Sequence, residues 1–257
     1  MFGARSDKGM VREINEDSFN VIAGSQGQPC TFIIADGMGG HNSGEVASKM
    51  AVDFISNYLY QTPELISLQN DASCENKISA AIQELILRAN AEVFSKSQQY
   101  PENKGMGTTL IVAVMREDNL YIGHVGDSRL YLITGDHIER ITTDHSFIEE
   151  LIKNGSLKRE EAENHPKKNL ITRAIGCSSD LEVDTYECGL NKNDILVLCT
   201  DGLTNMLDEE EIKNVVLGSE SLESACDELI RRANEKGGED NITVIVAKNT
   251  ETDAGER

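Results

Sequence analysis

Five aspartates stand beside short apolar segments, in places where carboxylates from distant parts of the chain could meet. Three of them directly follow a segment of strand length, and two closely precede one. In chain order they are Asp17, Asp36, Asp127, Asp201 and Asp240. Two carboxylates about 4 Å apart repel by about 4 kcal/mol at an effective dielectric constant of about 20. Because hard divalent cations with oxygen ligands relieve such repulsion, the pattern predicts a metal site.

Turn formation is the alternative explanation for each aspartate taken alone. Asp36 and Asp201 each precede a glycine, and Asp-Gly is a common turn pair because Gly accepts positive φ and Asp bonds nearby backbone. Three Asp-Gly or Asp-Ser pairs close three apolar segments, and two further acidic pairs flank others. This recurrence favours the metal site over turn chemistry.

The elements that must position these residues are visible in the hydrophobic pattern. Apolar residues at helical spacing predict helices over 46–59, 73–98 and 222–233, with shorter ones over 146–153 and 208–216. We expect Ser43 to cap the first helix, with Glu45 in its first turn.

The strand pattern predicts antiparallel sheets. Segments of strand length are 110–115, 120–125, 130–133, 138–141, 181–187, 195–200 and 242–247. Short turns join the first four, which predicts a single antiparallel meander. Since the helices come in separate blocks, we expect an α+β fold with helices packed outside antiparallel sheets.

No shift in composition divides the chain, so we expect one domain over residues 1–248. Residues 154–179 carry glycines, a proline and a local group of cations, and predict a mobile flap outside the core. A solvated surface loop is the alternative for this segment. Residues 249–257 are polar and predict a disordered tail.

The bulk composition excludes several classes of protein. A formal net charge of −20 disfavours nucleic acid and anionic membranes as partners. No apolar run approaches the length of a membrane span, and the first residues lack a secretory signal, so we expect a cytoplasmic protein. The six cysteines show no zinc-ligand spacing and indicate small buried side chains in a reducing compartment.

The acidic positions belong to a longer series of motifs. In order these are residues 6–18 with Asn-Glu-Asp at 15–17, Asp-Gly-Met-Gly-Gly-His at 36–41, Gly-Thr-Thr at 107–109, Gly-Asp-Ser-Arg at 126–129, Thr-Asp-Gly-Leu at 200–203 and Asp-Asn-Ile-Thr at 240–243. This succession resembles the PP2C-type, metal-dependent serine/threonine protein phosphatases, and most closely their bacterial branch. The resemblance runs from about residue 6 to 246.

The resemblance implies a four-layer α/β/β/α sandwich, in which helices flank two antiparallel sheets. It implies dephosphorylation of phosphoserine and phosphothreonine in proteins at a centre of two Mn²⁺ or Mg²⁺ ions, with a third ion in bacterial members. Glu16 would act through metal-bound water, and Arg12 would grip the substrate phosphate. The implied metal ligands are Asp17, Asp36, Asp201, Asp240 and the carbonyl of Gly37, with Asp127 joining Asp201 at the third site.

The residue types suit that chemistry. Oxygen ligands fit Mg²⁺ or Mn²⁺, and two such ions about 3.5–4 Å apart lower the pKa of a bridging water, whose hydroxide attacks phosphorus directly. Arg12 offers planar, bidentate donors to phosphate oxygens.

One position departs from the family pattern. Many eukaryotic members have a histidine, the proposed general acid, where this chain has Met38, which cannot donate a proton. His41 is the obvious substitute and His145 a second candidate. A metal-bound water is the third possibility.

Two other functions stay open. One is a non-catalytic phosphoprotein-binding regulatory module on the same fold, although all five aspartates are present. The other is a hydrolase of small phosphate esters. For the phosphatase we expect phosphorylated proteins as partners, namely a serine/threonine kinase and its targets, with no nucleic acid and no membrane, and a monomer.

Overall fold

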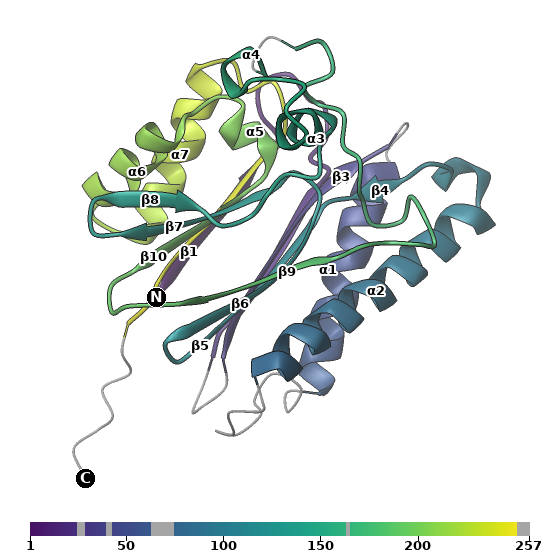
Figure 1. Ribbon diagram of the computed structural model, residues 1–257, viewed down its shortest axis with the longest axis horizontal. Helices are drawn as coiled ribbons and strands as arrows, with labels where there is room; N and C mark the ends of the chain where they lie inside the picture. The colour runs from purple at the N-terminus through teal and green to yellow at the C-terminus, as the bar shows by residue number, and fades with distance from the viewer. Residues whose placement is uncertain (25–28, 40–42, 63–74, 163–164, 251–257) are drawn as a thin grey trace.

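Two antiparallel sheets lie face to face and helices cover their outer faces in the computed structural model (Figure 1). The structure describes residues 1–24, 29–39, 43–62, 75–162 and 165–250. The first sheet has the strand order β2 (Asp17–Ile22), β3 (Cys30–Met38), β5 (Leu110–Arg116), β6 (Asn119–Val125) and β9 (Asp184–Gly189), with β4 (Gly107–Thr108) paired to β3. The second has the order β1 (Phe2–Asp7), β11 (Ile242–Lys248), β10 (Ile195–Cys199), β7 (Arg129–Thr134) and β8 (His137–Arg140). The expected α+β sandwich of four layers is confirmed.

The helices form two separate layers. Helices α1 (Ser43–Gln61) and α2 (Glu75–Gln99) pack on the first sheet, and α6 (Glu209–Gly218) and α7 (Leu222–Glu235) pack on the second (Figure 1). The short elements are η2 (Pro101–Asn103), α3 (Phe147–Lys153), α4 (Arg159–Ala162) and α5 (Asp201–Thr204). The expected helices are confirmed, with ends that differ by a few residues. Ser43 is itself the first residue of α1, and residue 73 lies outside the described residues.

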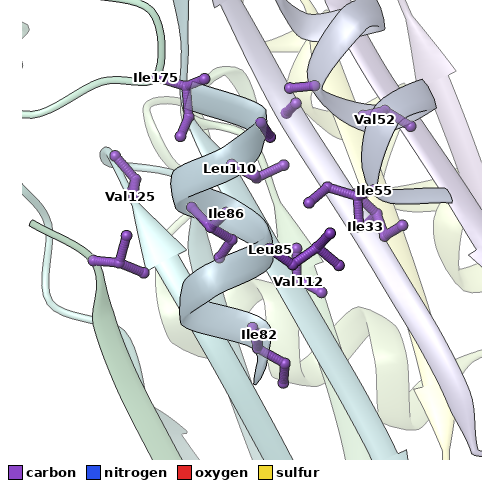
Figure 2. Close-up of a cluster of buried hydrophobic side chains, with 14 of the residues drawn as sticks. Ile33, Val52, Ile55, Ile82, Leu85, Ile86, Leu110, Val112, Val125 and Ile175 are labelled. Atoms are coloured by element: carbon purple, nitrogen blue, oxygen red, sulfur yellow. The ribbon is translucent and has the colours of Figure 1, made fainter. Parts of the chain in front are cut away.

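The core has three apolar layers because β-strand side chains alternate between the two faces of a sheet. In β3, Ile33 and Ala35 face α1 and α2, whereas Phe32 and Ile34 face the second sheet. Figure 2 shows the helix-facing layer, in which side chains of α1 and α2 meet those of the first sheet. Burying each large aliphatic side chain stabilises the fold by about 1.5–3 kcal/mol.

The predicted meander is wrong, although both of its hairpins exist. β5 pairs with β6 and β7 pairs with β8, but β6 continues to β9 in one sheet and β7 to β10 in the other. The connection Gly126-Asp127-Ser128 therefore crosses between sheets. Gly126 permits the crossing because its φ is +110°, and a Cβ there would lie 2.5 Å from Thr109 Cγ2.

The N-terminal strand β1 was not expected, because residues 2–7 show no apolar alternation. It pairs along its whole length with β11, so that Phe2 stands opposite Ala247 and Asp7 opposite Ile242. Tertiary pairing decides such a strand where local propensity does not.

The first residue of the expected tail is held on the core. Asn249 is buried, its backbone N–H donates to the Asp194 carbonyl at 2.9 Å, and its side chain donates to the Asn191 carbonyl at 3.2 Å. Residues 251–257 lie outside the described residues.

The segment 154–179 returns to the core over its last ten residues. Thr108 and Ile175 exchange backbone hydrogen bonds of 3.1 and 2.9 Å, and Thr172 N–H donates to the His145 carbonyl at 2.8 Å. Ile175 is fully buried. Across the part of the chain that is described, no helix has the length and apolarity to cross a membrane.

Candidate active site

Asp17 and Asp36 face each other across the ladder between β2 and β3. Directly opposed residues of an antiparallel pair have Cβ atoms about 4.5–5.5 Å apart, so two carboxylates are brought together by strand register alone. Asp17 Oδ2 accepts hydrogen bonds from Thr200 Oγ1 at 2.9 Å and Thr243 Oγ1 at 2.6 Å. Asp17 Oδ1 is buried and has no hydrogen-bond partner.

Asp201 reaches the same place from the other sheet. It follows the end of β10, as expected, and is the first residue of α5, so the turn that was the alternative explanation does not form there. Its Oδ2 accepts a hydrogen bond from Asn205 Nδ2 at 3.1 Å. Asp201 Oδ1 is buried without a partner.

Asp240 lies beside Arg12. Arg12 Nη2 stands 2.7 Å from Asp240 Oδ2, and both side chains are partly exposed. The next residue, Asn241, ties this loop to the N-terminal segment: its amide donates to the carbonyls of Lys8 and Ile14 at 3.0 and 2.8 Å, and its Oδ1 accepts from Glu16 N–H at 2.8 Å. From the sequence, Asn241 was noted only as part of the motif at 240–243, with no role assigned to it.

Asp127 is buried on the connection between β6 and β7, and its Oδ1 also lacks a partner. Burial raises its pKa to about 8, with further repulsion from Asp201 and Asp144. The structure therefore adds a third uncompensated carboxylate oxygen to those of Asp17 and Asp201.

Burial governs the protonation of the other carboxyls as well. It raises the pKa of Asp17 to about 7, against the lowering effect of the bonds from Thr243 and Thr200. It raises the pKa of Asp36 well above its usual range, and repulsion from Asp17 and Asp201 adds to the rise. The pKa of Asp201 is also raised, first by burial and then by Asp240. A nearby cation would reverse these shifts.

Gly37 sits in a tight backbone cradle. Its N–H donates to the Glu16 carbonyl at 3.2 Å, and a Cβ would lie 2.2 Å from the Gly44 carbonyl oxygen. Glu16 Oε1 lies only 2.6 Å from where a Cβ on Gly44 would stand, so the Glu16 carboxylate borders the first turn of α1.

Comparisons with known proteins agree with this geometry. The family model described as protein phosphatase 2C matches residues 10–246 of this chain. The chain belongs to the protein phosphatase 2C family. It is 39% identical over 251 residues to the serine/threonine phosphatase stp of Listeria monocytogenes, covering 98% of this chain and 96% of that protein.

Solved structures of this phosphatase family superpose on the fold. The serine/threonine phosphatase of S. agalactiae has a TM-score of 0.86 and 35% identity, covering 96% of this chain and 98% of that one. The catalytic domain of the phosphatase PstP, solved in complex with two manganese ions, has a TM-score of 0.79 and 32% identity, covering 98% of each chain.

The residues of this chain fit a divalent ion. Within the described residues, no three acidic, histidine or cysteine side chains already surround one point as ligands do. Two of the carboxyls instead have other partners: Asp240 pairs with Arg12, and Asp17 accepts hydrogen bonds from two threonines. Three buried carboxylate oxygens nevertheless remain free, and an all-oxygen donor set is what Mg²⁺ and Mn²⁺ take.

The structure describes only one of the two histidines that were expected as proton donors. His41 lies outside the described residues. Met38 is the last residue of β3. His145 is buried, with Nδ1 accepting from Gly126 N–H at 3.0 Å and Nε2 facing Asp184 Oδ2 at 3.2 Å. Both ring nitrogens already have partners, an arrangement that does not favour His145 as the general acid.

Proposed function

We propose that this protein phosphatase 2C chain hydrolyses phosphoserine and phosphothreonine in proteins, with Mn²⁺ or Mg²⁺ held by its buried carboxylates. The observation that carries the proposal is the set of three buried carboxylate oxygens without a partner, on Asp17, Asp127 and Asp201, next to the ion-paired Arg12. Buried charges are stable only when they are paired or coordinate a metal.

The proposed ligand set is the one that the resemblance to the protein phosphatase 2C family implies. Asp36, with the Gly37 carbonyl, and Asp17, Asp201 and Asp240 would hold two ions, and Asp127 with Asp201 would hold a third. Glu16 would orient water from the edge of the site. When bound there, the ions supply an activated water and neutralise the charge of the phosphate.

Arg12 would bind the substrate phosphate. A guanidinium has five N–H donors, and only Nη2 is engaged with Asp240. Asp240 therefore restrains the guanidinium while donors remain for two phosphate oxygens. Asn241 fixes the backbone that carries Arg12 through the carbonyls of Lys8 and Ile14.

A covalent phosphoenzyme on cysteine is not favoured. Burial raises the pKa of the Cys199 and Cys226 thiols to about 12, which leaves almost no thiolate at neutral pH. Direct transfer to water fits this chain, because activation of water needs no protein nucleophile.

The regulatory alternative has no support from the site, because every metal-binding aspartate is present. We further propose that the partners are a serine/threonine kinase and its phosphorylated targets, that the chain acts as a monomer in the cytoplasm, and that residues 1–248 form one domain. We also propose residues 154–179 as the flap, within which Leu170, Thr172 and Ile175 hydrogen-bond with residues outside the segment. The net charge of −20 favours phosphopeptides with basic flanking residues.

The test is phosphate release from a phosphothreonine peptide by metal-free protein with and without added Mn²⁺. We expect hydrolysis that depends on the metal, with kcat/KM higher for the phosphopeptide than for p-nitrophenyl phosphate. Asp118, an exposed aspartate between β5 and β6, supplies the matched control: Asp118→Asn should retain activity and Asp36→Asn should lose it. The proposal would be defeated if Mn²⁺ caused no release of phosphate. A higher kcat/KM for p-nitrophenyl phosphate than for the phosphopeptide would instead indicate a hydrolase of small phosphate esters.

A further inference from the structure

Two neighbouring histidines contact the residues on either side of Asp127, and neither is among the proposed metal ligands. The rings of His124, on β6, and His145 are buried with centroids 4.8 Å apart. Burial lowers the pKa of both imidazoles, so both are neutral at pH 7. Neutral imidazoles act as one donor and one acceptor, and the contacts of each ring determine which nitrogen has which role.

His145 binds both backbone polar groups of Gly126. Its ring Nδ1 accepts from Gly126 N–H at 3.0 Å, and its own backbone N–H donates to the Gly126 carbonyl at 2.8 Å. The residue before Asp127 is therefore held on both sides by a single residue from the loop that precedes α3.

Asp184 fixes the tautomer of His145. Because Nδ1 accepts a hydrogen bond, the ring proton must be on Nε2, which faces Asp184 Oδ2 at 3.2 Å. Arg173 Nη1 donates to Asp184 Oδ1 at 2.9 Å and keeps that carboxylate in place. Hydrogen bonds of this kind, behind a functional group, set its orientation in many metal sites.

The residue after Asp127 is held in the same way. The Ser128 carbonyl lies 3.0 Å from His124 Nε2, and Ser128 Oγ lies 2.7 Å from Thr109 Oγ1. Asp144, the neighbour of His145, makes a bidentate pair with Arg129. The backbone on both sides of Asp127 is thus fixed, while the Asp127 Oδ1 atom itself has no partner.

We propose that His145, kept in its Nε2–H tautomer by Asp184, is a positioning residue that aims the Asp127 carboxylate at a bound divalent ion. The inference rests on the proposed function in one respect, namely that Asp127 is a metal ligand. His145 acts through Gly126 and contacts neither substrate nor ion.

Calorimetric titration of the metal-free full chain with Mn²⁺ tests this without any substrate. In His145→Ala, the Kd of the most weakly bound Mn²⁺ should rise about 10- to 100-fold. His145→Asn should recover most of this loss, because its amide oxygen can stand near the position of Nδ1. His137 is an exposed histidine on β8, and His137→Asn should bind as the unaltered chain does. Unchanged Mn²⁺ affinity in His145→Ala would overturn the proposal.

A double-mutant cycle separates positioning from a general structural role. In an Asp127→Asn background, His145→Ala should cause no further change in ion affinity, because its effect passes through Asp127. Additive losses would overturn the proposal, since they would show that His145 acts on the whole site.

Nitrogen NMR of the unaltered chain tests the tautomer directly and does not depend on the folding of a variant. We expect the His145 ring to carry its proton on Nε2 and not on Nδ1. A proton on Nδ1 would refute the tautomer, and the proposal with it. Ion binding without phosphopeptide hydrolysis would defeat the proposed function alone. Absence of any Mn²⁺ binding would overturn the role of His145 as well.

Discussion

Thr200 and Thr243 donate to the same carboxylate oxygen of Asp17, and they are also joined to each other. Thr243 N–H donates to Thr200 Oγ1 at 2.9 Å, and Thr200 N–H donates to the Thr243 carbonyl at 3.1 Å. Thr243 of β11 and Thr200, the residue after β10, therefore orient a carboxylate that belongs to a strand of the other sheet. These contacts between the sheets fix the Oδ2 atom of Asp17 and leave its Oδ1 atom without a partner.

Thr243→Val should disturb Asp17 without changing the shape of the core. The lost hydrogen bond to a charged group is worth about 1.5–3 kcal/mol. Because the bond lowers the pKa of Asp17, its loss should raise that pKa above about 7 and move the pH needed for Mn²⁺ binding upwards. Calorimetric Mn²⁺ titrations between pH 6 and 8.5 measure the shift. Thr243→Ser keeps the donor and should bind like the unaltered chain.

The metal-free protein should lose stability as the pH rises from about 4 to about 8. Asp17 and Asp127 have pKa values of about 7 and about 8 in the folded state, raised from 3.8, so the folded state holds protons that the unfolded chain has released. The free energy of unfolding then falls with rising pH across this window. Thermal melts in chelator from pH 5 to 8.5 measure it.

The matched variant for that experiment is Asp17→Asn, which cannot ionise and should flatten the slope. A metal-free protein that becomes more stable over the same window would contradict the raised pKa values.

Arg12→Ala should impair substrate binding and leave the ions in place. Loss of charged hydrogen bonds to phosphate should lower kcat/KM about 10- to 100-fold. Mn²⁺ affinity should stay the same or rise, because Asp240 Oδ2 loses a competing partner at 2.7 Å. Steady-state kinetics and Mn²⁺ calorimetry on one preparation separate the effects. A large loss of Mn²⁺ affinity would show that Arg12 supports the ion site instead.

Bound metal should stabilise the fold, because it binds the native state and relieves repulsion between carboxylates. At a free Mn²⁺ concentration of 100 times Kd, the gain is about 2.7 kcal/mol for one site. Asp201→Asn should reduce this gain more than Asp240→Asn does, since Asp201 would contact more than one ion. Melting temperatures over a Mn²⁺ series measure both, and equal responses would argue against a shared Asp201.

Gly126→Ala should distort the crossing between sheets. A Cβ would stand 2.5 Å from Thr109 Cγ2 at a φ of +110°, so both steric overlap and backbone strain oppose it. We expect a loss of about 1–3 kcal/mol in denaturant unfolding, together with weaker Mn²⁺ binding at Asp127. Gly135→Ala is the control, because Gly135 also has positive φ, at +61°, but nothing within 4 Å.

The sequence located the clustered aspartates better than the strand connections that bring them together. The aspartates could be found because each lies where the local sequence changes between apolar and acidic residues. The crossing at Gly126 could not, because a short turn within one sheet and a short connection between two sheets have the same length and composition. Strand β1 was missed for a related reason, since its partner β11 lies about 240 residues away.

The groups that support the site were harder to predict than the site itself. Thr200, Thr243 and Asn241 flank the aspartates in their motifs, but nothing local says that two threonines would bond Asp17. His145 was considered as a proton donor because Met38 cannot be one. The positioning role that we propose for it depends on Gly126 and Asp184, which only the folded chain brings to its two nitrogens.

The pairing of β1 with β11 has a consequence for the order of folding. Arg12 and Asp17 are held by Asp240 and Thr243, which lie 228 and 226 residues away along the chain. Contacts between such distant residues carry a large loop-closure entropy and form slowly. A chain in which β1 and β11 have not yet paired therefore holds neither Arg12 nor Asp17 in place, and we expect catalytic competence to be a late event in folding.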